Sequence, residues 1–213
     1  MKHVPNALTV GRIAVTPLCL WGLASGRFWG QLGGTLAFML AAISDYWDGR
    51  LARQYGVRSR FGAFLDPLAD KVLVLGAFFV LMTVEPVGAW MPLWAVALVA
   101  ARDVAVTVLR WWHERQGRPL RTTTAAKWKT AAQLAFLLTI QVLLTVAHAR
   151  HLPGGPLRAL GAFVHALLDS PFTLVFLLVT VAATLYTGAL YFLPERAPRP
   201  AVRPAPGTRQ RAL

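Results

Sequence analysis

The sequence predicts an all-α, polytopic membrane protein with six transmembrane helices. Of its 213 residues, 56% are hydrophobic and only 15% are charged, which is too apolar for an ordinary soluble domain of this length. A helix needs about 20 apolar residues to cross a bilayer, and stretches of about this length lie at 7–25, 29–49, 62–84, 88–110, 128–148 and 171–193. These stretches lack the alternation of barrel strands, and backbone groups cannot stay unpaired in hydrocarbon, so helices are favoured.

Residues that commonly start helices precede the first and the last apolar stretch. Pro5 and Asn6 precede the first stretch, and Asp169, Ser170 and Pro171 precede the last; such residues start helices. The segment 151–169 contains Pro-Gly-Gly-Pro and then a short apolar run, which predicts an outer loop carrying an interfacial helix. We expect a membrane domain over 1–193 and a disordered tail over 194–213, because the Pro- and Arg-rich tail cannot build a core.

The basic residues predict the orientation. The chain has 22 Lys plus Arg and nine acids, a net charge of +13, but the basic residues cluster between apolar runs, which favours anionic lipid and phosphate-bearing substrates over nucleic acid. With the N-terminus inside, the outer loops carry only Arg27, Arg150 and Arg158. Basic residues are enriched on the cytoplasmic side, so both termini are predicted to be cytoplasmic. The inner segments carry Lys2, Arg50, Arg53, Arg58, Arg60, Arg115, Arg118, Arg121, Lys127, Arg196, Arg199, Arg203, Arg209 and Arg211.

Four of the nine acids fall between positions 41 and 71. In the first half of this segment, helical spacing of i, i+3, i+4, i+7 and i+8 places five residues on one face: Asp45, Asp48, Gly49, Ala52 and Arg53. In the second half, a spacing of four lines up Gly62, Asp66 and Asp70 on one face of the next helix. We expect the intervening turn to bring the four carboxylates together.

Carboxylates gathered at membrane depth must be protonated, paired with bases or neutralised by metal. Their oxygen ligands suit Mg²⁺ or Mn²⁺, and four acids are enough for two ions, which could clamp a phosphoryl group. Glycines on the same faces leave room for a nucleotide or pyrophosphate to approach. Two alternatives remain: structural ion pairs with close helix packing, and the ion pathway of a divalent-cation transporter or channel.

The pattern Asp-x2-Asp-Gly-x2-Ala-Arg-x8-Gly-x3-Asp-x3-Asp, from Asp45 to Asp70, resembles the signature of CDP-alcohol phosphatidyltransferases. The resemblance implies a six-helix membrane fold, usually dimeric, and transfer of a phosphatidyl group from a CDP-linked lipid to an alcohol with release of CMP. It implies that two metal ions are held by Asp45, Asp48, Asp66 and Asp70, and that Asp70 is also the general base. It assigns contacts with the donor cytidine and diphosphate to Gly49, Ala52, Arg53 and Gly62.

Three further segments, PNALTVGRIAVTP, ARDVAVTVLRWW and KWKTAAQ, resemble bacterial phosphatidylglycerophosphate synthases, whose acceptor is glycerol 3-phosphate. A phosphate acceptor fits four cations near the predicted cytoplasmic side, since Arg and Lys bind phosphate well: Arg102, Arg110, Lys127 and Lys129. Alternatively, the last three are anchors that snorkel to headgroups, and Arg102 forms a structural charge pair with Asp103.

The expected function is therefore metal-dependent phosphatidyl transfer from CDP-diacylglycerol to glycerol 3-phosphate, at the cytoplasmic face of the cell membrane. Within the same family, the alternative acceptors are inositol phosphate, another polyol, serine or phosphatidylglycerol. A divalent-cation transporter is the alternative of another class, and the glycines and Arg53 argue against it. The complete set of acids argues against a catalytically silent scaffold.

Overall fold

The computed structural model describes residues 4–55, 60–116 and 124–189, and regular structure in these ranges is entirely helical. This confirms the predicted all-α class. The long helices are α1 (Val4–Ala24), α2 (Phe28–Tyr55), α3 (Arg60–Leu81), α4 (Leu93–Arg115), α5 (Thr124–His148) and α7 (Pro171–Ala189). A shorter helix, α6 (Pro156–Leu168), and two 3-10 turns, η1 (Gly88–Trp90) and η2 (Ala149–His151), complete the described part.

The six long helices coincide with the six predicted apolar stretches, and α6 forms within the predicted outer loop. Two segments, Thr130–His151 and Pro171–Ala189, are by themselves long and apolar enough to cross a membrane. The crossing of a membrane by all six long helices stays a prediction, as does the orientation of the termini. The predicted tail lies outside the described residues.

Two of the helix boundaries that differ from the predicted ones have a local cause in the sequence. Helix α2 continues beyond 49 to Tyr55, because hydropathy marks only its apolar part and the following Arg, Leu, Ala and Gln are good helix formers. Helix α4 begins at Leu93 rather than at 88. Pro92 disfavours helical backbone at the preceding residue, and Met91 accordingly has φ −112° and ψ 83°.

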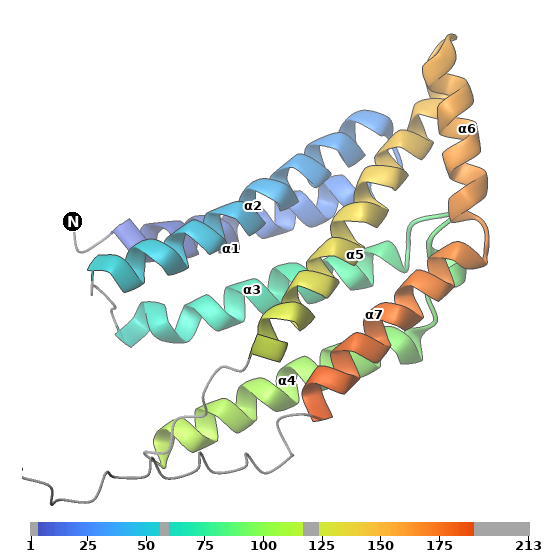
Figure 1. Cartoon of the computed structure of the whole chain (residues 1–213). Coiled ribbons are helices and arrows are strands. Elements are labelled where there is room, and N and C mark those ends of the chain that lie inside the picture. Colours follow the sequence, from blue (N-terminus) through green and yellow to red (C-terminus); the bar gives the residue numbers. More distant parts are fainter. Residues whose placement is uncertain (1–3, 56–59, 117–123, 190–213) are drawn as a thin grey trace, which may run out of the picture.

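The helices form an elongated bundle in which α1 and α5 make most of the connections (Figure 1). Helix α1 packs against both α2 and α3, while α5 packs against α2, α3, α6 and α7. Helix α4 is held mainly by α7 and also contacts α3. The ends of α2 and α3 that carry the acidic pattern lie at the same end of the bundle (Figure 1).

Helices α1 and α2 touch backbone to backbone. A Cβ atom added to Gly34 of α2 would lie 2.6 Å from the backbone nitrogen of Leu23, and one added to Gly22 would lie 3.0 Å from the Cα of Gly34. The Sγ of Cys19 donates a hydrogen bond to the Gly34 carbonyl oxygen, at 3.3 Å. Small residues that allow such close approach are a principal source of helix association in membranes.

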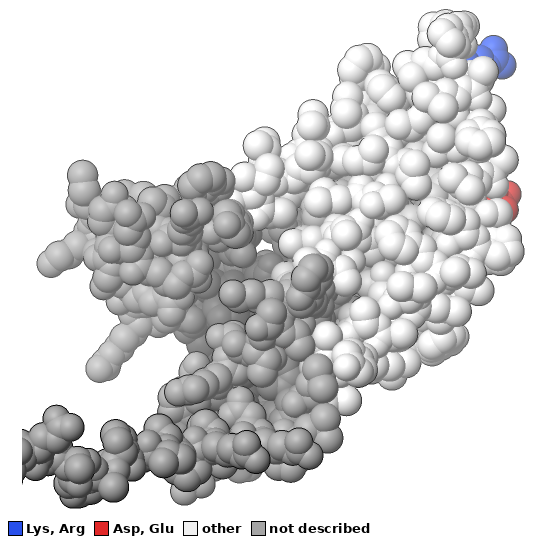
Figure 2. Space-filling view, in the orientation of Figure 1, with Lys and Arg blue, Asp and Glu red and all other residues white. Residues whose placement is uncertain are grey.

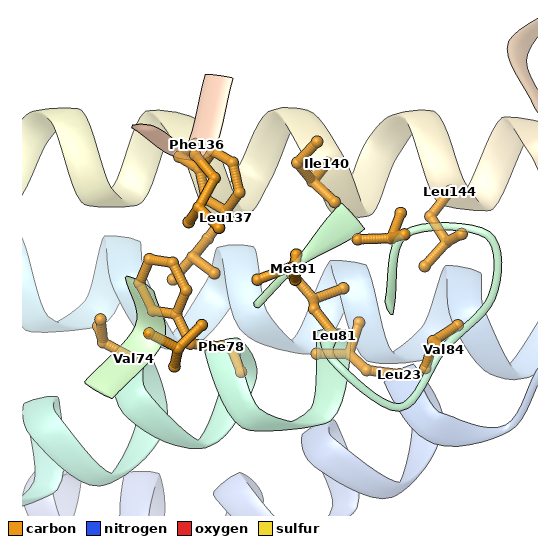
Figure 3. Close-up of a cluster of buried hydrophobic side chains, with 14 of the residues drawn as sticks. Leu23, Val74, Phe78, Leu81, Val84, Met91, Phe136, Leu137, Ile140 and Leu144 are labelled. Atoms are coloured by element: carbon orange, nitrogen blue, oxygen red, sulfur yellow. The ribbon is translucent and has the colours of Figure 1, made fainter. Parts of the chain in front are cut away.

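Aromatic rings join α3, α5 and α7 in the centre of the bundle. The Phe78 and Phe136 rings stack with their centroids 5.5 Å apart, and Phe136 meets Phe176 edge to face at 5.0 Å. Phe78, Phe136, Leu137 and Ile140 are fully buried, and Figure 3 shows them converging between the helices. Such aromatic pairs add about 0.5–1.5 kcal/mol beyond the burial of their area.

The outer surface of the described bundle is strongly apolar. Over the described part of the face in Figure 2, uncharged residues cover almost everything, and Lys, Arg, Asp and Glu atoms appear only near one end. Large side chains such as Trp21, Leu18 and Phe163 are exposed by 75%, 67% and 69%. Contiguous exposed apolar surface of this kind marks contact with a membrane or a partner.

We predict that Gly34→Ala destabilises the protein, because its new methyl group meets the Leu23 backbone, which cannot move aside as a flexible side chain could. Overpacking of this kind costs about 1–3 kcal/mol, which should appear as a lower midpoint of thermal unfolding in detergent. Gly33→Ala is the matched control, since a Cβ at Gly33 meets nothing within 4 Å. Equal midpoints for the two variants would show that the α1–α2 contact is not tight.

Candidate functional site

The acidic pattern lies on two continuous helices. Asp45, Asp48, Gly49, Ala52 and Arg53 all belong to α2, and Gly62, Asp66 and Asp70 all belong to α3. Because both segments are regular helix, the predicted spacing does place each group on one helix face. The side chains of these residues lie outside what the structure describes, so the convergence of the four carboxylates stays a prediction.

A group of charged and polar side chains lies directly next to the second half of the pattern. Lys71, which follows Asp70 in α3, places its Nζ 3.9 Å from Oδ2 of Asp103 in α4. The Arg102 Nη1 atom lies 3.5 Å from Oδ1 of the same carboxylate. Asp103 is 3% exposed, and burying an ionised carboxylate is favourable only with such partners.

This group also reaches α7. Arg102 donates through Nη2 to the Oγ1 of Thr187 at 3.5 Å, while Thr187 in turn donates to the Ala183 carbonyl at 2.8 Å. The Arg102 side chain lies so close to Gly188 that a Cβ there would meet its Nε at 2.8 Å. The charged group therefore joins α3, α4 and α7 beside the turn of α3 that carries Asp70.

The four predicted acceptor-phosphate residues fall into two sets. Arg102 is engaged by Asp103 and Thr187, which is the structural alternative foreseen for it. Arg110 belongs to α4, and Lys127 and Lys129 belong to the beginning of α5, but their side chains are not among those described. Sequence reasoning did not single out Lys71 or Thr187, because nothing in a local pattern pairs them with Arg102 and Asp103.

The far end of α4 combines aromatic and basic groups. The Arg115 guanidinium lies over the Trp111 ring, with its Cζ 3.6 Å from the ring centroid, a cation–π contact worth about 0.5–1 kcal/mol when exposed. Trp111 and Trp112 are 46% and 60% exposed. Exposed tryptophans beside a basic residue at a helix end are typical of the membrane–water interface.

Comparison with known proteins places the acidic pattern in a recognised family. Residues 2–186 match the family model for CDP-alcohol phosphatidyltransferase. A CDP-diacylglycerol–glycerol-3-phosphate 3-phosphatidyltransferase of Cereibacter sphaeroides is 36% identical over 152 residues, covering 71% of this chain and 67% of the relative. CDP-diacylglycerol–glycerol-3-phosphate 3-phosphatidyltransferase 2 of Arabidopsis thaliana is 32% identical over 162 residues, covering 71% of this chain and 70% of the relative. That of Escherichia coli K12 is 34% identical over 139 residues, covering 63% and 74%.

We predict that Asp103→Asn destabilises the bundle, because it leaves the charges of Lys71 and Arg102 without their shared carboxylate. Breaking a buried ion pair in this way costs about 3 kcal/mol or more, which thermal unfolding in detergent, followed by tryptophan fluorescence, should detect. Asp169→Asn makes the same chemical change at an exposed carboxylate and should change stability by about 0.5 kcal/mol or less. A stable Asp103→Asn protein would argue against a structural role for this group.

Proposed function

The chain belongs to the CDP-alcohol phosphatidyltransferase family, and from this premise we propose that it transfers the phosphatidyl group of CDP-diacylglycerol to glycerol 3-phosphate. The products are phosphatidylglycerophosphate and CMP. The observation that carries the proposal is the complete acidic pattern on α2 and α3, in a chain whose relatives are named for this reaction. A pair of metal ions held by carboxylates is suited to the transfer of a substituted phosphoryl group from a diphosphate to a hydroxyl.

The donor atoms of the pattern fit a hard divalent cation. Asp45, Asp48, Asp66 and Asp70 offer only carboxylate oxygens, the ligands that Mg²⁺ and Mn²⁺ prefer. We assign all four to the binding of two such ions, which would supply neutralisation of the donor diphosphate. The family resemblance supports this assignment, and so does the high charge density of four acids in one short segment.

We assign the proton transfer and the binding of the donor to residues of the chain itself. Asp70 accepts the proton from the attacking hydroxyl of glycerol 3-phosphate, and the oxygen forms a bond to the phosphorus that carries the diacylglycerol. The bond from that phosphorus to the bridging oxygen breaks, and CMP leaves. Arg53 binds the diphosphate with charge-assisted hydrogen bonds, while Gly49, Ala52 and Gly62 leave room for the cytidine and its phosphates.

Binding of the acceptor phosphate requires cations other than Arg53, from helices other than α2 and α3. Arg110 at the C-terminal half of α4 and Lys127 and Lys129 at the start of α5 come from the next pair of helices along the chain. We assign the acceptor phosphate to these three residues. The contacts of Arg102 with Asp103 and Thr187 favour a structural role, so the acceptor site is proposed without it.

We extend the proposal to the membrane. The large hydrophobic side chains exposed on the described helices, the nearly uncharged face in Figure 2 and the excess of basic residues in alternate loops support a multi-pass protein of the cell membrane with its site and both termini in the cytoplasm. In that location the donor's acyl chains stay in lipid while its headgroup enters the site. On the family resemblance we propose a homodimer.

We predict that purified protein with CDP-diacylglycerol and Mg²⁺ releases CMP with glycerol 3-phosphate and, among a panel of acceptors, prefers it to inositol phosphate, serine and phosphatidylglycerol. Asp70→Asn should lower the rate by about 10² to 10⁴, the usual contribution of a general base, and excess EDTA should abolish turnover. Asp66→Asn should weaken the binding of Mg²⁺, so that more Mg²⁺ is needed for turnover, or end activity. Glu85→Gln, an exposed acid outside the pattern, is the control.

The outcome of this assay separates the alternatives. Release of CMP with another acceptor would support the family's reaction but show that glycerol 3-phosphate is not the acceptor. Turnover in excess EDTA would contradict the metal assignment. Metal flux into proteoliposomes without any CMP release would identify a cation transporter instead.

We predict that Arg110→Ala and Lys127→Ala harm the use of the acceptor, because each removes one charge-assisted contact with its phosphate. Such a loss should lower kcat/KM for glycerol 3-phosphate by roughly ten- to hundredfold, mainly through the acceptor KM if ground state and transition state are bound alike. Arg53→Ala should instead lower kcat/KM for CDP-diacylglycerol more than kcat/KM for glycerol 3-phosphate. Arg115→Ala, an arginine of the same helix as Arg110 that lies on Trp111, should leave the acceptor KM unchanged.

Unchanged acceptor kinetics in both variants would identify Arg110 and Lys127 as membrane anchors. A change confined to the KM for CDP-diacylglycerol would place them at the donor instead.

A further inference from the structure

An apolar groove of about 300 Å³ lies between α2, α5 and α6. This volume is at the lower end of the range for ligand pockets, about 300–1,000 Å³. Phe28, Leu32, Leu36 and Met39 line it from α2, Val142, Val146 and Ala149 from the end of α5 and η2, and Leu157 from α6. Leu36, Val142 and Leu157 are 50%, 45% and 46% exposed, so the groove opens on the outside of the bundle.

The two polar residues of the groove form a hydrogen bond with each other. Thr35 and Thr145 complete its lining, and their Oγ1 atoms lie 3.1 Å apart. Thr145 donates its own proton to the Gln141 carbonyl at 2.8 Å, so Thr35 is the donor of the bond between them. Both hydroxyl protons are thus used within the protein, and the groove suits a hydrocarbon chain better than a polar ligand.

Three arginines adjoin residues that line this groove. Arg27 precedes Phe28, Arg150 follows Ala149, and Arg158 follows Leu157, so each is a chain neighbour of a lining residue. They are also the three basic residues that the charge count assigns to the outer loops. No acidic residue lines the groove or adjoins a lining residue in the sequence. We call these three arginines, which adjoin the apolar lining in the chain, the cationic rim of the groove.

Helix α6 is fixed against α5 at this rim. A Cβ added to Gly161 would lie 2.5 Å from the backbone nitrogen of Arg150 and 2.9 Å from the Val146 carbonyl oxygen. Burial, and after it the charge of Arg150, lowers the pKa of His165 on α6, so this charge is felt across the helix contact. Arg150 also donates through Nε to Nε2 of His151 at 3.0 Å. Lys and Arg atoms appear in Figure 2 at the end of the described face where α6 begins in Figure 1.

We propose that this groove is a binding site for an anionic phospholipid, with an acyl chain along α2 and α5 and the phosphate at Arg27, Arg150 and Arg158. The commitment to a lipid rests on the match between an apolar wall and a cationic rim, which is the pattern of a phospholipid with a charged headgroup. Exposed Leu160 and Phe163 on α6 continue the apolar surface beside the rim, as an interfacial helix requires.

The arginine end of this site is separate from the acidic pattern. Phe28 begins α2, and Asp45 lies 17 positions further along the same helix, a rise of about 25 Å at 1.5 Å per residue. Met39, at the other end of the groove, is six positions before Asp45, about 9 Å, so it is a headgroup at the arginines that is distinct from a donor headgroup at the carboxylates. The proposal does not depend on which acceptor the enzyme uses.

The test is native mass spectrometry of the full-length protein after reconstitution with equal amounts of phosphatidylglycerol and phosphatidylcholine. Wild-type protein should retain phosphatidylglycerol preferentially, and the triple variant Arg27→Ala, Arg150→Ala, Arg158→Ala should retain it at least about tenfold less, the change expected for even one lost charge-assisted contact. The control variant Arg203→Ala, Arg209→Ala, Arg211→Ala removes the same charge from the tail and should behave as wild type.

A second variant tests the wall of the groove. Val142→Trp should fill it and lower retention of both lipids, whereas Val175→Trp, at a position of α7 that is 57% exposed and outside the groove, should not. Unchanged retention in the triple variant or in Val142→Trp overturns the proposal. Displacement of phosphatidylglycerol by millimolar inorganic phosphate would identify a free-phosphate site, and a loss of dimer mass in Val142→Trp with lipid retention intact would identify an interface between copies. Either result also overturns it.

Discussion

The contact between the α1 and α2 backbones is the constraint on which the rest of the bundle depends. Gly22 and Gly34 let the two helices touch without intervening side chains, and Cys19 bonds to the Gly34 carbonyl across the contact. Between helices in lipid there is little hydrophobic driving force, so close packing and hydrogen bonds have to supply the association energy. Because α1 also packs against α3, this contact relates the positions of the two helices that carry the acidic pattern.

Several buried polar groups in this protein join helices. Asp103 accepts contacts from Lys71 and Arg102 and so connects α3 with α4, while Thr187 brings in α7. Thr35 and Thr145 form an equivalent connection between α2 and α5. In apolar surroundings an unpaired polar group is costly, so each such contact selects one arrangement of the helices among the many that apolar packing alone would allow.

Helix α2 connects two regions with opposite chemical character. Its C-terminal half carries carboxylates suited to cations and, through them, to the diphosphate of a lipid donor. Its N-terminal half lines an apolar groove whose neighbouring charges are all arginines. The separation follows from the length of the helix, and the predicted crossing of the bilayer by α2 would place its two ends in different interfaces. One helix can thereby serve headgroup chemistry at one face and lipid binding at the other.

The sequence by itself determined the all-α class, the approximate positions of six long helices and the helical spacing of the acidic pattern, because these depend on residues close together in the chain. Pro92 also indicated the start of α4, although the apolar stretch used to predict this helix begins before it, at 88. Only the tertiary structure decided that Lys71 pairs with Asp103, that Thr35 meets Thr145 across 110 positions, and that α2, α5 and α6 enclose a groove. Such contacts depend on how closely helices cross and at what angle. That geometry is set by packing between distant segments, as at Gly22 and Gly34, and no local pattern specifies it.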